Sequence, residues 1–64
     1  MNSITITAHQ YALAVQALDI ERAEYHILTV QGARSALLDQ AQSRIDYATA
    51  RLEWMRREMA AQSR

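Results

Sequence analysis

The sequence predicts an all-α fold in which two long helices form an antiparallel hairpin. Half of its 64 residues are apolar but only four are aromatic, and the apolar share comes mainly from alanine, leucine, isoleucine and methionine. Most of these residues favour helices. The chain has no proline and a single glycine, Gly32, near its middle. A composition this poor in helix breakers, with one interruption, indicates two helices and argues against a β or α/β fold.

The first helix is predicted to begin at about residue 8, where two start signals coincide. Thr7 and Gln10 have the spacing of a capping box, in which the Thr7 hydroxyl accepts the Gln10 amide proton and the Gln10 side chain reaches back. Ile6 and Tyr11 occupy the two positions of a hydrophobic staple. Residues 2–6 alternate polar and apolar side chains, which is the period of a strand. That run is too short to stand alone, and whether it forms an intersubunit strand stays open.

Gly32 is predicted to end the first helix at about residue 31. Glycine suits the left-handed conformation that closes many helices, and a turn over residues 32–34 then leads to a second helix over about residues 35–61. The alternative is one uninterrupted helix, in which Gly32 costs about 1 kcal/mol. A lone central glycine between two helical patterns favours the short connection. Residues 1–64 are therefore interpreted as a single helical-hairpin domain.

Apolar residues of the second helix recur at alternating spacings of three and four, a heptad seam sustained over three repeats. Its a positions are Leu38, Ile45, Leu52 and Met59, and its d positions are Ala41, Ala48 and Met55. Because large and small side chains alternate, this face is predicted to pack closely on another helix.

The first helix is apolar over most of its circumference. One stripe comprises Leu13, Ala17, Ile20, Ala23, Ile27 and Val30, and a second comprises Tyr11, Ala14, Leu18, Tyr25 and Leu28. The polar arc is narrow and centres on Asp19, Arg22 and His26. Such a helix needs cover on more than one side. One stripe can pack on the second helix, so the other predicts a second chain and a homodimer in the form of a four-helix bundle.

The small size of the chain also favours association. A chain of 64 residues without cysteines has no disulfide to stabilise it, so a second subunit or a partner is the remaining source of stability. The parallel or antiparallel arrangement of the dimer stays open.

Tyr47 and Trp54 lie seven residues apart, off the heptad seam. They form either a second packing stripe inside the bundle or a face that binds a partner, and the two interpretations merge if the partner is a second copy of the chain. Rigid aromatic side chains beside charged ones have the composition of an interface hot spot. The predicted partner-binding set is Tyr47, Ala50, Arg51, Trp54, Arg57 and Glu58.

The titratable residues form no catalytic or metal-binding pattern. His9 and His26 are the only histidines, and on one helix seventeen residues separate them by about 25 Å. Cysteine is absent, and the carboxylates are scattered along the helices rather than facing one another. We therefore expect no enzymatic activity, no cofactor and no metal.

Seven arginines balance seven acidic residues, so the chain lacks the basic excess typical of nucleic-acid binders. The distribution is uneven, however. One arginine and three acidic residues precede Gly32, giving −2, whereas six arginines and four acidic residues follow it, giving +2. The two halves are predicted to attract each other.

The alternating run of residues 3–7, followed by two helices that meet at Gly32, resembles the ribbon-helix-helix repressors. The resemblance implies a dimer whose N-terminal strands enter the major groove. The stretch before Gly32 is long for that family's first helix, and the run carries no Arg or Lys. A dimer of such hairpins is also similar in architecture to a small plasmid regulator that binds paired RNA loops, and to chaperones of type III secretion needle subunits. A nucleic-acid-binding regulator of ribbon-helix-helix or helical-hairpin type is the alternative function.

The longest uninterrupted apolar stretch, from Tyr11 to Val15, is too short to cross a bilayer, and the N-terminus shows no secretory signal pattern. We expect a cytoplasmic protein, located in the host cytoplasm if a phage encodes it. The leading hypothesis is a non-catalytic protein-binding module, which acts as an adaptor, a chaperone or an inhibitor of a host protein.

Overall fold

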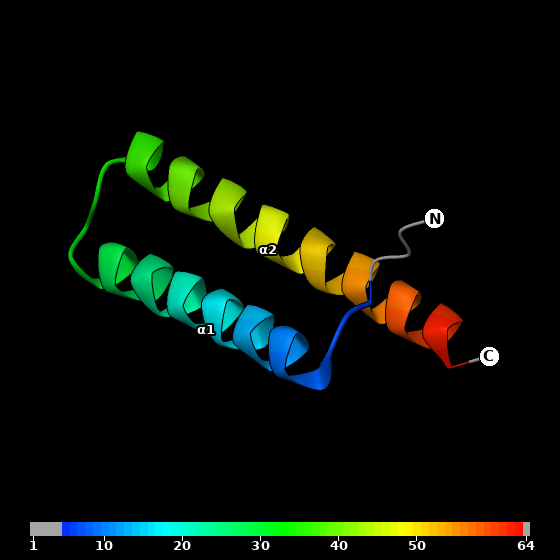
Figure 1. The fold of residues 1–64 in the computed structure, drawn as a ribbon. Helices are drawn as coiled ribbons and strands as arrows, with labels where there is room; N and C mark the ends of the chain where they lie inside the picture. The colour runs from blue at the N-terminus through cyan, green and yellow to red at the C-terminus, as the bar shows by residue number, and fades with distance from the viewer. Residues whose placement is uncertain (1–4, 64) are drawn as a thin grey trace.

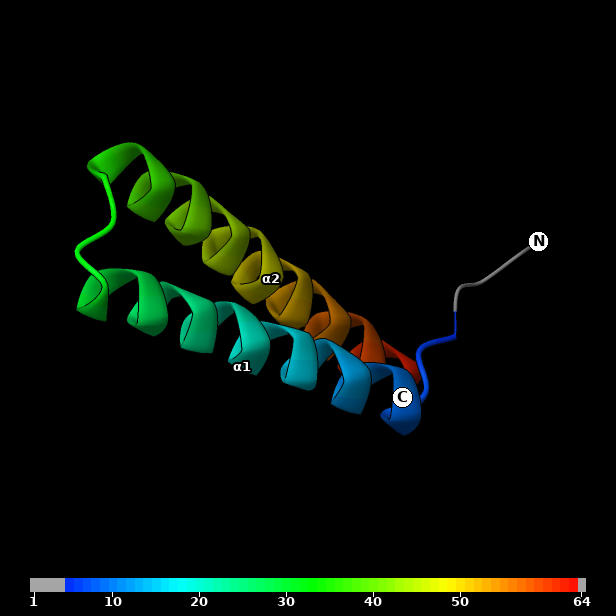
Figure 2. The same ribbon diagram turned by 90° about the vertical axis from the view of Figure 1, so that its left-hand side faces the viewer.

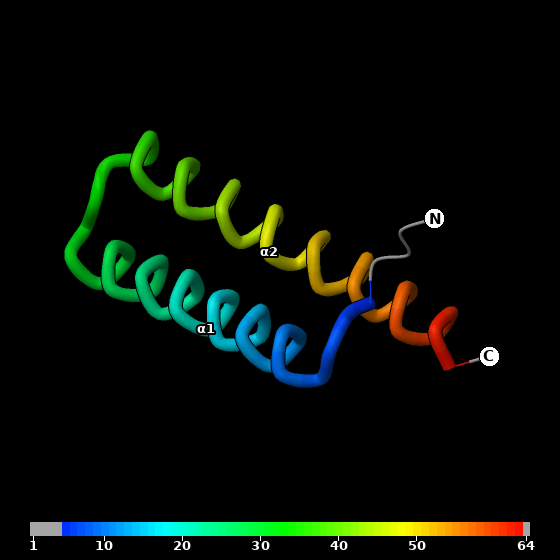
Figure 3. Tube along the Cα trace, in the orientation of Figure 1, coloured from blue at the N-terminus to red at the C-terminus, as the bar shows by residue number. Residues whose placement is uncertain are grey.

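The computed structural model describes residues 5–63 and shows two helices packed against each other as an antiparallel hairpin (Figure 1). Helix α1 spans Ala8–Val30 and helix α2 spans Ser35–Gln62. The Cα trace reverses direction once, between the two helices (Figure 3). The predicted all-α hairpin is confirmed, and the alternative of one uninterrupted helix is wrong.

Helix α1 begins with a complete capping box. The Gln10 backbone N–H donates to the Thr7 hydroxyl at 3.1 Å, and the Thr7 backbone N–H donates to the Gln10 side-chain oxygen at 2.9 Å. Two of the amide groups that a helix start leaves without partners are thereby satisfied. Ile6 is buried and Tyr11 is half-buried, so both apolar residues flanking the cap contribute to the interior.

The turn is a Schellman motif closed by Gly32. Gly32 adopts a φ of 72°, and its N–H donates to the Thr29 carbonyl at 3.1 Å. The Ala33 N–H donates to the Leu28 carbonyl at 3.0 Å. These two bonds satisfy carbonyls at the end of α1 and reverse the chain within a few residues, and only glycine adopts such a φ without a steric cost.

The core lies between the helices and is concentrated toward the open end of the hairpin. Its buried members are Ile6, Ala14, Leu18, Leu52 and Met55, with Tyr11, Val15, Ile45, Ala48 and Met59 partly buried against them. Figures 1 and 2 show the helices converging from the turn toward this end. All seven residues of the predicted α2 seam are buried or half-buried, and Ala41 is fully enclosed nearer the turn.

The segment before α1 crosses to the end of α2. The Ile6 N–H donates to the Gln62 side-chain oxygen at 2.7 Å, and the Gln62 side-chain amide donates to the Ile6 carbonyl at 3.0 Å. Gln62 thus pairs with the Ile6 backbone as a neighbouring strand would. Of the residues predicted to have strand character, 2–4 lie outside the described part of the chain, and Thr5 and Ile6 are not in a strand. At Ile6, the backbone groups that an intersubunit strand would use are bound within the chain.

Polar contacts between the helices show their register. Arg44 pairs with Glu21 at 2.9 Å and, through a second nitrogen, with Glu24 at 3.7 Å. Two nitrogens of Arg56 donate to the Tyr11 hydroxyl at 3.2 and 3.1 Å, and this hydrogen bond raises the pKa of the Arg56 guanidinium above its ordinary value. Because the helices are antiparallel, moving one residue forward along α1 keeps level with moving one residue back along α2.

The predicted attraction between the halves has a more local origin than their net charges. Helix α1 carries −2, but α2 contains four arginines and four acidic residues and is neutral. The excess of the second half comes from Arg34, which precedes α2, and from Arg64, which lies outside the described residues. The electrostatic link that the structure shows is the contact of Arg44 with the two glutamates.

Candidate functional site

Large apolar side chains remain exposed on both helices. Within residues 5–63 they are Leu13, Ile20, Ile27, Val30, Leu37, Tyr47 and Trp54. The exposed fraction is 59% for Ile20 and 73% for Tyr47. Of the two stripes predicted on α1, the one containing Leu18 packs on α2, and the one containing Leu13 and Ile20 is left uncovered.

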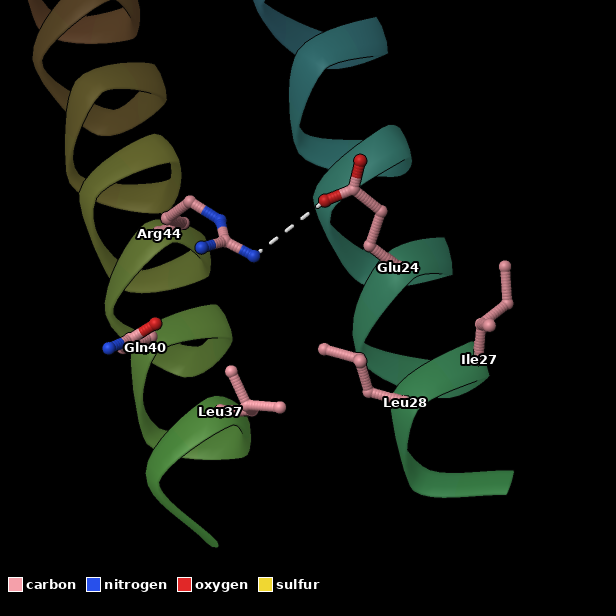
Figure 4. Close-up of a pocket in the computed structure, with 6 residues that line it drawn as sticks. All are labelled: Glu24, Ile27, Leu28, Leu37, Gln40 and Arg44. Carbon is pink, nitrogen blue, oxygen red and sulfur yellow. Dashed lines mark ion pairs between the residues drawn. The ribbon is translucent and has the colours of Figure 1, made fainter. Parts of the chain in front are cut away.

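A cavity near the turn shows which way these exposed side chains point. It is lined by Glu24, Ile27, Leu28, Leu37, Gln40 and Arg44. In Figure 4, Leu28 and Leu37 point into the space between the helices, Arg44 reaches across toward Glu24, and Ile27 stands at the outer edge. The cavity opens where the helices are widest apart, and its floor is apolar.

The exposed stripe of α1 borders the same side of the hairpin as this cavity. Ile27 lines the cavity, and Ile20 and Leu13 precede it at intervals of seven residues. Residues seven apart on a helix differ by only about 20° in direction. The three side chains therefore form one row, with Ala17 and Glu24 beside them at spacings of three and four.

The aromatic residues of α2 lie on that side too. Arg44 lines the cavity near the turn, and Arg51, seven residues later, lines a second cavity together with Trp54. Tyr47 lies between the two arginines, three residues after the first and four before the second. Helical neighbours at these spacings share one side, so Tyr47 and Trp54 flank the row of arginines on α2.

Six of the exposed apolar side chains thus gather on one side of the hairpin, which we name the apolar face. It consists of Leu13, Ile20 and Ile27 of α1 and Leu37, Tyr47 and Trp54 of α2. Helical geometry directs Val30 away from it. The opposite side is polar, and on it lie Arg22, His26 and the contact between Arg56 and Tyr11.

The predicted partner-binding residues lie on or beside the apolar face. Tyr47 and Trp54 belong to it, Arg51 lies between them, and Glu58, which is half-buried, follows Trp54 toward the C-terminal end. Ala50 and Arg57 are also exposed, and each follows an aromatic residue of the face by three positions, at its outer edge. Arg57 lines a different cavity with Glu53, Arg56 and Ala60.

Sequence reasoning did not include the apolar residues of α1 in the partner-binding set, and it missed Leu37. The signal was present as a second heptad pattern on each helix. On α2 this line comprises Leu37, Gln40, Arg44, Tyr47, Arg51 and Trp54 at spacings of three and four, and only half of these residues are apolar. Such a mixed line is a weaker signal than the fully apolar seam that packs on α1.

No protein-family model matches this sequence, and no curated protein or solved structure is significantly similar to it. Across residues 5–63, neither helix is both long enough and apolar enough to cross a bilayer. The same residues contain no group of three or more His, Asp or Glu side chains placed to hold a metal ion. The chemistry of the apolar face is therefore the basis for a functional proposal.

Proposed function

We propose that this chain is a non-catalytic protein-binding module whose apolar face binds protein, either a second copy of the chain in a four-helix bundle or a target on which it acts as an adaptor, chaperone or inhibitor. The observation that carries the proposal is the gathering of six exposed, large apolar side chains on one side of a two-helix unit. Several large apolar side chains exposed on one side of a protein are typical of an interaction site.

The composition of the face supports binding of protein rather than of a small molecule. Tyr47 and Trp54 are rigid aromatic side chains beside Arg51, and Trp, Tyr and Arg are the residues enriched at interface hot spots. The face is long and shallow instead of enclosed, which suits another helix better than a compact ligand. An amphipathic helix or helix pair is the matching shape.

Photo-cross-linking tests this proposal directly. A benzophenone amino acid replaces Tyr47 on the apolar face, and a matched variant carries it at His26 on the polar side. Irradiation in cells that make the protein, followed by mass spectrometry, identifies the attached molecules. We expect protein adducts from position 47 and few from position 26.

Two results would contradict the proposal. Equal yields at the two positions would mean that the apolar face is not a preferred contact. A position-47 variant that attaches to nucleic acid and not to protein would instead favour the alternative of a nucleic-acid-binding regulator. Binding of that kind also weakens steeply with added salt, because phosphate contacts release counterions.

A further inference from the structure

We infer that the occupant of the apolar face is a second copy of this chain, laid face to face so that α1 of each copy runs antiparallel along α2 of the other. The inference rests on the proposed function and names its partner. It follows from the register of the hairpin, the order of side chains on the two helices, the charges on the face and the size of the face.

The register comes from the contact between Tyr11 and Arg56. Two residues further along α1 and two back along α2, Leu13 lies level with Trp54. By the same stepping, Ile20 lies level with Tyr47.

A twofold axis parallel to the helices preserves this register between subunits. Such a rotation leaves the height of every residue along the axis unchanged, so α1 of one copy meets α2 of its partner at the levels already fixed within the hairpin. Leu13 then lies beside Trp54 of the partner subunit, and Ile20 beside Tyr47 of the partner subunit. The large apolar side chains of the face are paired without any adjustment along the axis.

The residues between these pairs are compatible in size and charge. Ala17 comes within one residue of the level of Arg51 of the partner subunit, and its small side chain leaves room for the arginine stem. Glu24 likewise comes within one residue of the level of Arg44 of the partner subunit, so opposite charges lie close together. Arg44 already pairs with two glutamates of its own chain. In the dimer, the same three residues would also lie close to the oppositely charged residues of the partner subunit.

The charges also favour one of the two orientations in which the faces of two copies can stack. A twofold axis across the helices would place α1 on α1 and α2 on α2, which brings the −2 helices together and sets the arginines of the face opposite each other. An axis along the helices sets the acidic residues of one copy against the basic residues of the other. Like charges in contact are disfavoured, and unlike charges set partner orientation.

The width of the hairpin suits a second copy as the occupant. The molecule is 48 Å long and 18 Å wide, which is wider than the roughly 10–12 Å diameter of one helix with its side chains. An isolated helix from another protein would cover only part of this width. A second hairpin covers all of it and gives each helix two neighbours.

Disulfide trapping tests the arrangement cleanly, because the chain has no cysteine of its own. A17C is made with ¹⁵N label and R51C without it, and the two are mixed and mildly oxidised. Mass spectrometry then distinguishes the mixed disulfide from the two symmetrical ones. H26C and Q42C form the matched control, since these two positions also come within one residue of the same level but lie on the polar side.

We expect the mixed A17C–R51C product to exceed the share given by random pairing, while the control pair gives no such excess. Light scattering of the unmodified chain should show a dimer, and W54A should raise its dissociation constant by about tenfold or more. A predominance of A17C–A17C or R51C–R51C product would overturn the inferred stacking. A monomer at every concentration would overturn the second copy as occupant, yet adducts of another protein at position 47 would still support the proposed function.

Discussion

Replacement of Ile6 by alanine is predicted to destabilise the protein strongly, although the residue lies outside both helices. Its exposed fraction is 5%, and it packs in the core with Leu18 and Leu52. Burial this complete means that truncation removes nearly the full transfer free energy and leaves a cavity. The expected loss in the free energy of unfolding is about 2–4 kcal/mol. For a domain of this size, that lowers the midpoint of thermal unfolding by more than about 10 °C.

The side-chain amide of Gln62 also holds the segment before α1 in place. Q62A removes two hydrogen bonds to the Ile6 backbone, which at a partly exposed site contribute about 1 kcal/mol together. Once Ile6 is truncated and the segment before α1 is no longer held in the core, the hydrogen bonds from Gln62 contribute little further stability. The double variant should therefore lose less than the two single variants combined, by about 1 kcal/mol.

Urea unfolding followed by far-ultraviolet circular dichroism measures these effects, at one fixed protein concentration because association adds to apparent stability. V30A is the matched control, since Val30 is 73% exposed and is not part of the core. If I6A unfolds at the same urea concentration as V30A, the segment before α1 is not part of the core. Strict additivity of I6A and Q62A would show that the hydrogen bonds and the apolar contact act independently.

Three further predictions, made with five variants, test the fold. L52D places a charge in the buried seam with no partner and should unfold the chain, whereas D46N, at an exposed site where the carboxylate accepts a bond from Gln42 at 2.9 Å, should keep its helical dichroism. G32A should lower the free energy of unfolding in urea by about 1–2 kcal/mol. No atom blocks the new Cβ, but a φ of 72° is strained for alanine. An unchanged midpoint would mean that the turn relaxes. T7A removes the cap of α1 and should lower the free energy of unfolding by about 1 kcal/mol. T7S keeps the hydroxyl and should restore most of this loss. If serine does not restore it, the methyl group of Thr7 contributes to stability.

The apolar face could be assembled only in part from the sequence. The stripe of Leu13, Ile20 and Ile27 was recognisable from its spacing, and so were Tyr47 and Trp54 from theirs. Their position on one side of the hairpin was not, because it depends on how far each helix is rotated about its own axis. The heptad seam predicts the rotation of α2, but both stripes of α1 are apolar, so the rotation of α1 depends on its contacts with α2, including that of Arg44 with Glu21.

The helices, their ends and the reversal of the chain at Gly32 could be predicted from local sequence, because caps, heptad spacing and glycine conformation act over a few residues. That Ile6 belongs to the core follows only from its contacts in the folded chain. Its backbone N–H bonds to a side chain 56 residues away, and a contact between such distant residues produces no repeating pattern in the sequence. The tertiary structure also decided which stripe of α1 faces α2, since both stripes are apolar enough to be buried and the choice depends on the fit between the two surfaces.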